Sequence, residues 1–377
     1  MSWLFWISAA FLGYTFLGYP LVVFFLSLGR KRGHRRAAIF PTVSMIVPVY
    51  NGSSVLAKKI ENCLTLNYPK DRLEIIISSD GSTDATVKIA QSYGDRGVKL
   101  IEIPQRQGKH HAQMVARDAA HGDILVFTDV SIRLDPDALE KMVSNFADEA
   151  VGCVSSEDRL LEAKRGSLGE KSYVQLEVRL RRLESHVGSL VGLSGSFFAA
   201  RREVCEKWHA GQSSDFFVAL HSVMQRKRAV VDPESLGYYT LTASERGELY
   251  RKVRTIVHGL DVFFTHLEVA NPFRYGFFAC ELISHKLFRW LTPFGFLGVA
   301  VSSLFLWRSS SFYRAVVIVE ALLLGAGLLA LLVDRVVTIK PLKLAAFFLL
   351  GNVATIMAWL KFCAGERYVH WEPTRRS

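Results

Sequence analysis

Both ends of this chain are strongly apolar, and this feature most limits what it can fold into. Residues 3–28 carry no charged side chain, and about 20 apolar residues in a helix span the ~30 Å hydrocarbon core of a bilayer. Three further apolar runs lie at residues 291–307, 315–333 and 344–360. Charged residues make up only 21% of the chain. We therefore expect an integral membrane protein and exclude a wholly soluble, disordered or collagen-like chain.

The basic residues after the first apolar run predict its orientation. Five Lys or Arg side chains lie between positions 30 and 36, and such residues stay on the cytosolic side of a span. We expect a multi-pass protein of the cell (inner or plasma) membrane, with its N-terminus outside and its body in the cytosol. A nucleic-acid surface is the other interpretation of the cluster, but its position beside a span argues against nucleic acid as a partner.

The same patterns divide the chain into segments. We expect a transmembrane helix at 1–29, a basic cytosolic linker at 30–40, a cytosolic domain at 41–270, an interfacial amphipathic helix at 271–290, three C-terminal transmembrane helices at 291–361 and a basic tail at 362–377. The interfacial assignment rests on a mixture of large apolar side chains with acidic and basic ones. Three C-terminal crossings would leave the basic tail outside, so a re-entrant segment is the alternative to one of them.

The cytosolic domain begins with a simple alternation. Short β-branched runs at 43–50, 74–80, 98–104 and 123–130 are separated by helix-like stretches at 53–65, 82–93 and 109–120. Strands that alternate with helices of this length indicate βαβ units, and therefore an α/β fold with a mainly parallel sheet. In such sheets ligands bind beyond the carboxyl ends of the strands.

Polar residues follow these strand ends. Asp80 and Asp129 each end a strand, and Lys109 opens a helix. Each has a plainer explanation as a turn former or a solvated helix residue, but together they suit a phosphorylated ligand held with a divalent cation. The adjacent His110 and His111 are expected at the surface or in the pocket wall, because neighbouring helix residues do not face one site.

Short motifs in a fixed order carry a resemblance to a known family. Residues 48–52 read PVYNG, 78–86 SSDGSTDAT, 107–113 QGKHHAQ and 124–131 ILVFTDVS; this order resembles the nucleotide-sugar half of family 2 glycosyltransferases with a GT-A fold. The stretch GLSGS at 192–196 resembles the acceptor-side loop, and SSDFF at 213–217 resembles the segment of the catalytic base. RKVRT at 251–255 is similar to the (Q/R)xxRW motif of membrane-embedded members, including cellulose, chitin and hyaluronan synthases. The resemblance implies that 41–270 is a GT-A nucleotide-sugar-binding domain, with helices on both faces of the sheet and transmembrane helices flanking it.

The resemblance also implies roles for particular residues. Asp215 is the expected general base, and Asp129 is the expected ligand of a divalent cation, Mg²⁺ or Mn²⁺. The expected substrate-binding residues are Tyr50, Asn51 and Asp80 at the nucleoside, Lys109 at the base or phosphates, Gly195 and Ser196 at the acceptor, and Arg251 and Arg254 at the diphosphate. By pattern alone, Asp215 also suits the first turn of a helix, and the two arginines also suit lipid headgroups.

Two departures from the family pattern bear on function. Ser131 stands where the family usually has the second Asp of Asp-x-Asp, and Thr255 replaces the tryptophan after RxxR. The first weakens the expected metal site, and the second weakens the case for a processive polymerase. We expect a membrane-bound inverting glycosyltransferase that moves a sugar from a UDP-sugar to a growing polysaccharide or glycoconjugate at the cytosolic membrane face. The alternatives are a membrane-lipid acceptor, or a catalytically silent partner of a synthase with other membrane subunits.

Overall fold

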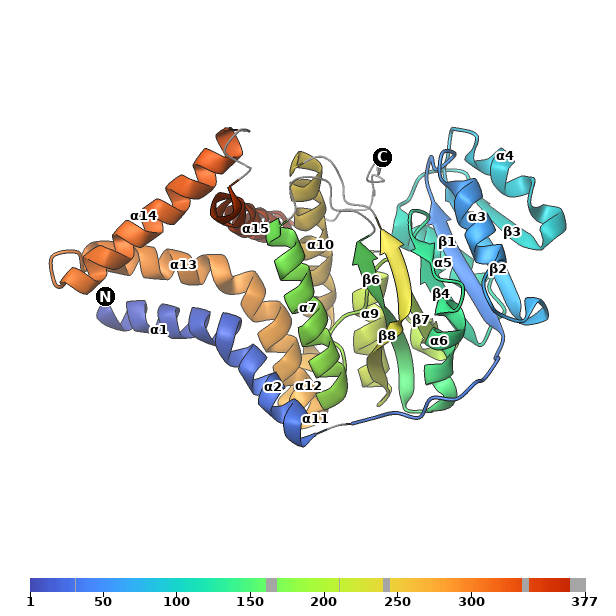
Figure 1. Ribbon diagram of the computed structural model, residues 1–377, viewed down its shortest axis with the longest axis horizontal. Helices are drawn as coiled ribbons and strands as arrows, with labels where there is room; N and C mark the ends of the chain where they lie inside the picture. The colour runs from blue at the N-terminus through green and yellow to red at the C-terminus, as the bar shows by residue number, and fades with distance from the viewer. Residues whose placement is uncertain (31, 161–167, 210, 240–244, 334–338, 367–377) are drawn as a thin grey trace.

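A computed structural model describes the chain except for residues 31, 161–167, 210, 240–244, 334–338 and 367–377. It has two parts: a sheet with its helices, and a set of long apolar helices (Figure 1). The long helices α7 (Leu168–Val187) and α10 (Glu245–Thr265) stand between the two parts.

Within the described residues, eight strands form one sheet in the order β3-β2-β1-β4-β7-β6-β8-β5. The strands are β1 (Val43–Val49), β2 (Leu73–Asp80), β3 (Val98–Ile103), β4 (Ile124–Thr128), β5 (Arg133–Leu134), β6 (Val151–Leu160), β7 (Phe197–Arg201) and β8 (Arg228–Tyr239). The first four strands run parallel, as the sequence predicts. The second half is mixed, because β7 lies antiparallel between β4 and β6.

Helices cover both faces of the sheet, which confirms the predicted fold class. The helices of this part are α3 (Leu56–Leu64), α4 (Thr86–Gln91), α5 (Lys109–Asp118), α6 (Ala138–Ser144), α8 (Arg202–Cys205) and α9 (Ser214–Met224). Every residue of β1 is buried, and alternate side chains of a strand point to opposite faces. Met45 accordingly packs in a core with α3 and α6, whereas Ile46 packs in a second core with α5 and α9.

Four helices are long and apolar enough to cross a membrane: Ser2–Gly29, Phe277–Phe305, Ser311–Leu332 and Pro341–Cys363. The first comprises α1 (Ser2–Gly13), a π-helical turn and α2 (Tyr19–Gly29); the second comprises α12 (Phe277–Leu282), a π-helical turn (Ile283–Leu287) and α13 (Phe288–Phe305). The others are α14 (Ser311–Leu332) and α15 (Lys340–Cys363), and the short α11 (Pro272–Tyr275) precedes α12. Residues 277–290 of the segment expected at the interface thus form the first part of one continuous helical run, and 271–276 precede it.

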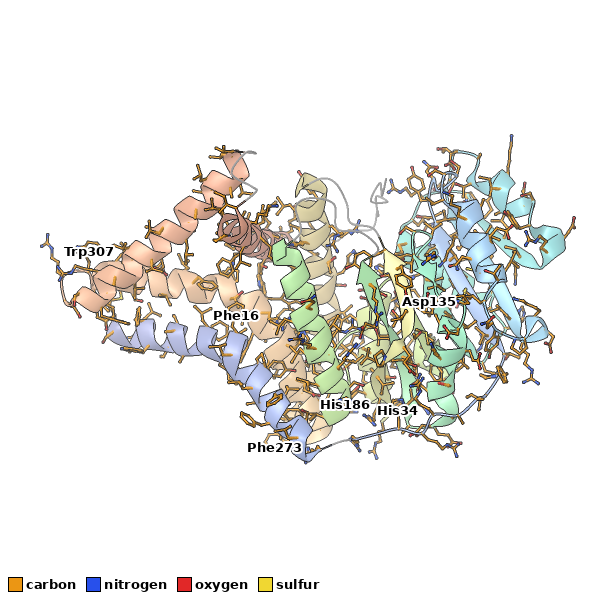
Figure 2. The ribbon with its side chains drawn as sticks, viewed as in Figure 1. Phe16, His34, Asp135, His186, Phe273 and Trp307 are labelled. Atoms are coloured by element: carbon orange, nitrogen blue, oxygen red, sulfur yellow. The ribbon has the colours of Figure 1, made fainter. Side chains whose placement is uncertain are left out.

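These helices pack closely where their side chains are small. A side-chain carbon at Gly295 would lie 2.9 Å from the Phe11 ring, so glycine lets α13 approach α1. Elsewhere these segments expose large apolar side chains, including Phe16, Trp307 and the 99% exposed Phe273 of α11 (Figure 2). Exposed apolar surface of this extent is typical of helices that face lipid.

The basic linker lies along the sheet rather than free in solvent. Its Arg35 side chain donates to the Ala147 carbonyl at 2.7 Å, and Arg36 pairs with Asp232 at 3.1 Å. The Arg32 amide donates to the His186 carbonyl, at the end of α7, at 2.9 Å. The linker therefore fixes the end of the first apolar helix against the sheet part.

Candidate active site

Three of the predicted site residues meet at one edge of the sheet. The Lys109 ammonium lies 2.5 Å from Oδ1 of Asp129, and it donates to the Gly195 carbonyl at 3.0 Å. Lys109 opens α5, Asp129 follows β4, and Gly195 precedes β7. The parallel strands β3 and β4 end at this edge, and β7 begins there because it runs antiparallel to β4, so residues distant in sequence come together.

Asp80 organises the loop that leads into α5. It is 2% exposed, and its two carboxylate oxygens accept from the amides of Gln107 at 2.8 Å and Gly108 at 2.7 Å. The next residue, Gly81, has φ +64°, and a side-chain carbon there would lie 2.5 Å from the Arg106 nitrogen. Glycine is therefore required at position 81 by both backbone conformation and space.

Tyr50 and Asn51 lie beside this loop, at the end of β1. The Arg106 guanidinium carbon stacks over the Tyr50 ring, 4.0 Å from its centroid. Asn51 has φ 46°, and its Oδ1 accepts from the Thr83 amide at 2.8 Å. The strand-end loops predicted to line a nucleoside site are thus adjacent, and a planar cation–aromatic pair forms part of their surface.

The predicted general base, Asp215, lies in the first turn of α9. The Ser213 hydroxyl donates to its Oδ1, and the Leu193 amide donates to its main-chain oxygen at 3.2 Å. A side-chain carbon at Gly195 would lie 3.2 Å from Oδ2 of Asp215. Gly195 therefore has the Lys109–Asp129 pair at its carbonyl and the Asp215 carboxylate at its α-carbon.

Ser196 holds the acceptor-side loop to the sheet. Its hydroxyl donates to Oδ2 of Asp158, on β6, at 2.8 Å, and Ser194 donates to the same oxygen. The Ser196 carbonyl accepts from the Asp129 amide at 2.9 Å. Asp158 escaped the sequence analysis because no local motif distinguishes it from other strand carboxylates.

Lys59 is a second residue that the sequence analysis missed. It is 3% exposed, and its ammonium donates to the Thr128 hydroxyl at 2.8 Å and to the Ile132 carbonyl at 2.7 Å. Burial lowers its pKa. A signal did exist, because Lys59 shares the inward face of α3 with Leu56, Ile60 and Cys63, where only apolar residues are expected. Lys59 braces the turn that carries Asp129.

Two half-buried histidines lie near Asp215. The His110 and His258 rings are 5.3 Å apart, and Nδ1 of His110 lies 3.4 Å from the Ser214 amide. Burial, together with the charges of His258, Lys109 and Arg254, holds the pKa of His110 well below its usual range. Burial also lowers the pKa of His258. A neutral His110 accepts the Ser214 amide hydrogen and so positions the start of α9.

The two arginines of the RxxR motif lie on α10. Arg254 is close enough to His110 and His258 for its charge to lower both pKa values. Arg251 lies one turn earlier on the helix, where its carbonyl accepts from the Thr255 hydroxyl at 2.9 Å. The structure thus brings Arg254 towards His110, the residue that follows Lys109.

The residues present fit a divalent cation that is shared with a bound diphosphate. Among the described residues, no group of three or more His, Cys, Asp or Glu side chains is arranged to hold a metal ion. Asp129 supplies one carboxylate, whose side chain is 22% exposed. One carboxylate together with substrate phosphates is a common set of ligands for Mg²⁺. The donor set therefore fits a cation that arrives with the nucleotide rather than one bound by protein ligands alone.

Known proteins similar to this chain include glycosyltransferases. Residues 44–208 match the family model described as Glycosyl transferase family 2. The chain is 35% identical over 106 residues to an uncharacterized glycosyltransferase of Haemophilus influenzae, covering 28% of this chain and 42% of the relative. It is 26% identical over 184 residues to a beta-monoglucosyldiacylglycerol synthase of Nostoc, covering 46% and 39%. The chain thus spans about two fifths of the length of these curated relatives.

A solved structure matches nearly the whole chain. The mannosyltransferase PcManGT from Pyrobaculum calidifontis, in complex with GDP-Man and Mn²⁺, superposes with a TM-score of 0.74 at 23% identity, covering 97% of this chain and 100% of that one. The match shows a shared fold, including the apolar helices. The chain carries a GT-A domain of the kind found in glycosyltransferases. Its residues 44–208 are similar to glycosyltransferase family 2.

Proposed function

We propose that the chain is a membrane-bound inverting glycosyltransferase, which transfers a sugar from a nucleoside diphosphate sugar to an acceptor at the cytosolic membrane face. One observation carries the proposal. Gly195 lies between the Lys109–Asp129 pair, which suits a diphosphate, and the Asp215 carboxylate, which suits an acceptor hydroxyl. This arrangement supports a reaction in which the leaving diphosphate and the base act from opposite sides of Gly195.

In the proposed reaction the acceptor oxygen attacks the anomeric carbon, and the bond from that carbon to the diphosphate oxygen breaks. Asp215 takes the acceptor proton, a step worth about 10² to 10⁴ in rate. Lys109 meets the charge that develops on the leaving diphosphate. A cation held by Asp129 would stabilise the same charge as a Lewis acid. Because the sugar is displaced once, its anomeric configuration inverts.

The nucleoside side of the site is proposed from the strand-end loops. Tyr50 and Asn51 flank the loop that Asp80 holds, and the Arg106–Tyr50 stack offers a flat surface for a base. A UDP-sugar is the donor that the sequence favours. The GDP-Man in the solved relative makes a GDP-sugar the necessary comparison.

The acceptor is proposed to be a membrane lipid or glycoconjugate. Thr255 in place of the synthase tryptophan argues against a processive polymerase, and one of the relatives is named as a synthase of a glucosylated diacylglycerol. Four apolar helices support membrane association. We propose that the N-terminus faces outward, as the basic residues after the first helix predict.

The test is a donor panel with the full chain in nanodiscs. UDP- and GDP-sugars are supplied with Mg²⁺ or Mn²⁺ and a membrane lipid extract, and nucleoside diphosphate release and the anomeric configuration of the product are measured. Release with one donor and an inverted product is expected. A retained configuration would overturn the mechanism, and no release with any donor would favour the silent partner of a synthase.

A further inference from the structure

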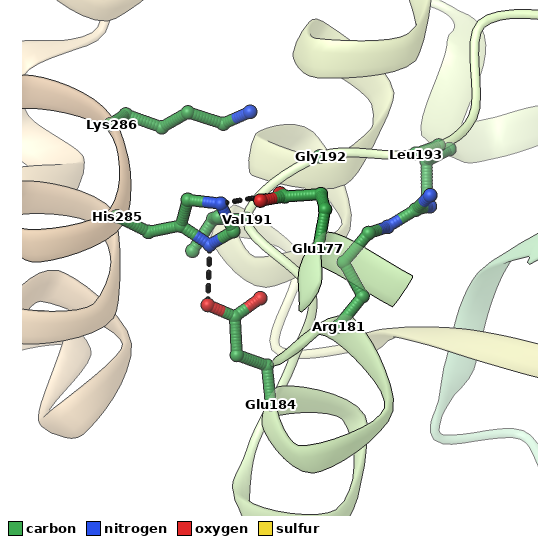
Figure 3. Close-up of a pocket in the computed structure, with 8 residues that line it drawn as sticks. All are labelled: Glu177, Arg181, Glu184, Val191, Gly192, Leu193, His285 and Lys286. Carbon is green, nitrogen blue, oxygen red and sulfur yellow. Dashed lines mark hydrogen bonds and ion pairs between the residues drawn. The ribbon is translucent and has the colours of Figure 1, made fainter. Parts of the chain in front are cut away.

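A small polar pocket lies where the apolar helices meet the sheet part. It has a volume of about 210 Å³, and Figure 3 shows it between α7, the π-helical turn Ile283–Leu287 and the loop that follows α7. The residues that line it are Glu177, Arg181, Glu184, Val191, Gly192, Leu193, His285 and Lys286. Gly192 and Leu193 belong to the acceptor-side loop described above, and the other six lining residues lie outside that site.

One wall of the pocket is a fixed hydrogen-bond network. His285 lies between two carboxylates, with Nε2 2.7 Å from Oε1 of Glu177 and Nδ1 2.5 Å from Oε1 of Glu184 (Figure 3). The Tyr19 hydroxyl, from the first apolar helix, donates to the same Glu184 oxygen at 2.5 Å. Burial opposes ionisation of Glu177, but the charges of His285 and Arg289 outweigh it and hold its pKa well below the usual range. This wall is therefore charged and rigid.

Other polar groups in the pocket are left without a protein partner. Glu184 is fully buried, yet within the described part of the chain its Oε2 accepts no hydrogen bond, and Nε of Arg181 donates none. Lys286 extends its ammonium into the same space (Figure 3), 5.4 Å from the Phe216 ring. Buried polar groups in folded proteins are nearly always paired. The unpartnered Nε of Arg181 and Oε2 of Glu184, with the Lys286 ammonium beside them, therefore indicate a polar ligand.

The pocket adjoins the proposed general base. A side-chain carbon at Gly192 would lie 3.2 Å from the Lys286 ammonium, and the next residue, Leu193, donates its amide to the main-chain oxygen of Asp215. On the other side, His285 and Lys286 belong to the second apolar helical run. The pocket thus lies between an apolar helical run and the loop that contacts Asp215.

We propose that the pocket binds the hydroxyl-bearing headgroup, a single sugar or polyol unit, of a membrane-anchored acceptor. The inference rests on the proposed glycosyltransferase function and names its acceptor class. A hydroxyl both donates and accepts, so it satisfies the Glu184 oxygen as well as the Lys286 and Arg181 donors. A phosphate has acceptors only and would add negative charge beside Glu184. The volume is below the ~300–1,000 Å³ of pockets for drug-sized ligands, so it suits one ring.

The test measures lipid binding separately from catalysis. The full chain is reconstituted in phosphatidylcholine nanodiscs with glucosyldiacylglycerol, diacylglycerol or phosphatidic acid, and native mass spectrometry gives the fraction of protein that carries each probe. Lys286→Met is compared with Lys88→Met, which changes an exposed lysine on the remote helix α4. Glu184→Gln is the second variant, and nucleotide binding by each variant reports that it is folded.

Wild-type protein should retain glucosyldiacylglycerol over the other two probes. Lys286→Met and Glu184→Gln should each weaken this binding about tenfold or more, as expected for a lost hydrogen bond to a charged group, whereas Lys88→Met should not. Stronger retention of phosphatidic acid, or equal binding by wild type and Lys286→Met, would overturn the proposal. A wild-type protein that binds the glucosyl lipid but no nucleotide sugar would instead refute the proposed function and leave the pocket assignment standing.

Discussion

Replacing Asp80 with asparagine should damage the nucleotide end of the site more than any other single-atom change there. The Asp80 carboxylate is 2% exposed and accepts two backbone amides, at 2.8 and 2.7 Å. Asparagine keeps one acceptor but turns an NH₂ group towards the other amide. Hydrogen bonds to a charged group contribute about 1.5–3 kcal/mol each, and an amide left without a partner costs about 1–3 kcal/mol. We therefore expect Asp80→Asn to lower the free energy of unfolding by about 2–4 kcal/mol.

The assay is thermal unfolding of the full chain in detergent, followed by intrinsic fluorescence, beside a nucleotide titration. For a domain of this size 1 kcal/mol shifts Tm by about 2–4 °C, so a fall on the order of 5–15 °C is expected. Nucleotide affinity should fall as well, because the loop carries the Arg106–Tyr50 stack. Asp95→Asn, at an exposed turn residue, is the matched control. A wild-type Tm together with wild-type nucleotide affinity in Asp80→Asn would refute the reasoning.

Three further predictions follow from the site. Lys109→Met removes the ammonium group 2.5 Å from Asp129. The nucleotide-free protein should therefore bind Mn²⁺ several-fold more tightly, while its affinity for a nucleotide sugar should fall about tenfold. Mn²⁺ titration followed by electron paramagnetic resonance measures the first effect, and weaker Mn²⁺ binding would contradict the prediction. Gly195→Ala places a methyl group 3.2 Å from Oδ2 of Asp215. The value of kcat should therefore fall about tenfold or more, with little change in Tm. An unchanged kcat would show that the position of the Asp215 carboxylate is not critical for catalysis. The pKa values of His110 and His258 are lowered in the folded state. Their contribution to the free energy of unfolding is therefore complete above the unfolded-state pKa of ~6.5 and is lost as the pH falls below it. The loss is up to about 1.4 kcal/mol per pH unit for each histidine. The dependence of Tm on pH between 8 and 5 should therefore be shallower in His110→Asn than in wild type. Identical slopes would count against a lowered pKa of His110.

Much of the first half of the sheet could be predicted from the sequence. Its strands are short apolar runs that alternate with helices, and the polar residues after them converge because parallel strands end at one edge. The second half could not. Strand β7 reads FFAAR, a short apolar run that periodicity cannot distinguish from buried helix. Its antiparallel place between β4 and β6 depends on long-range pairing.

The site was predictable where local motifs exist and not where side chains pair across the fold. Asp80 ends β2, Asp129 follows β4 and Asp215 lies in the first turn of α9, and each stands in a short motif. Asp158 reaches the acceptor-side loop only because β6 and β7 are neighbours. His285 and Glu177 lie 108 positions apart in the chain. No local pattern links His285 to Glu177. From the sequence alone, the charged residues of 271–290 are equally consistent with a helix at the membrane surface, and only the structure shows that they contact α7.

The central claim is that Asp215 removes the acceptor proton at a site that binds the donor independently of it. The most direct measurement compares nucleotide-sugar binding with nucleoside diphosphate release in Asp215→Asn and wild type, with Asp95→Asn as control. The account predicts wild-type donor affinity in Asp215→Asn, with release reduced by about 10² to 10⁴. Release at the wild-type rate with unchanged binding would contradict it.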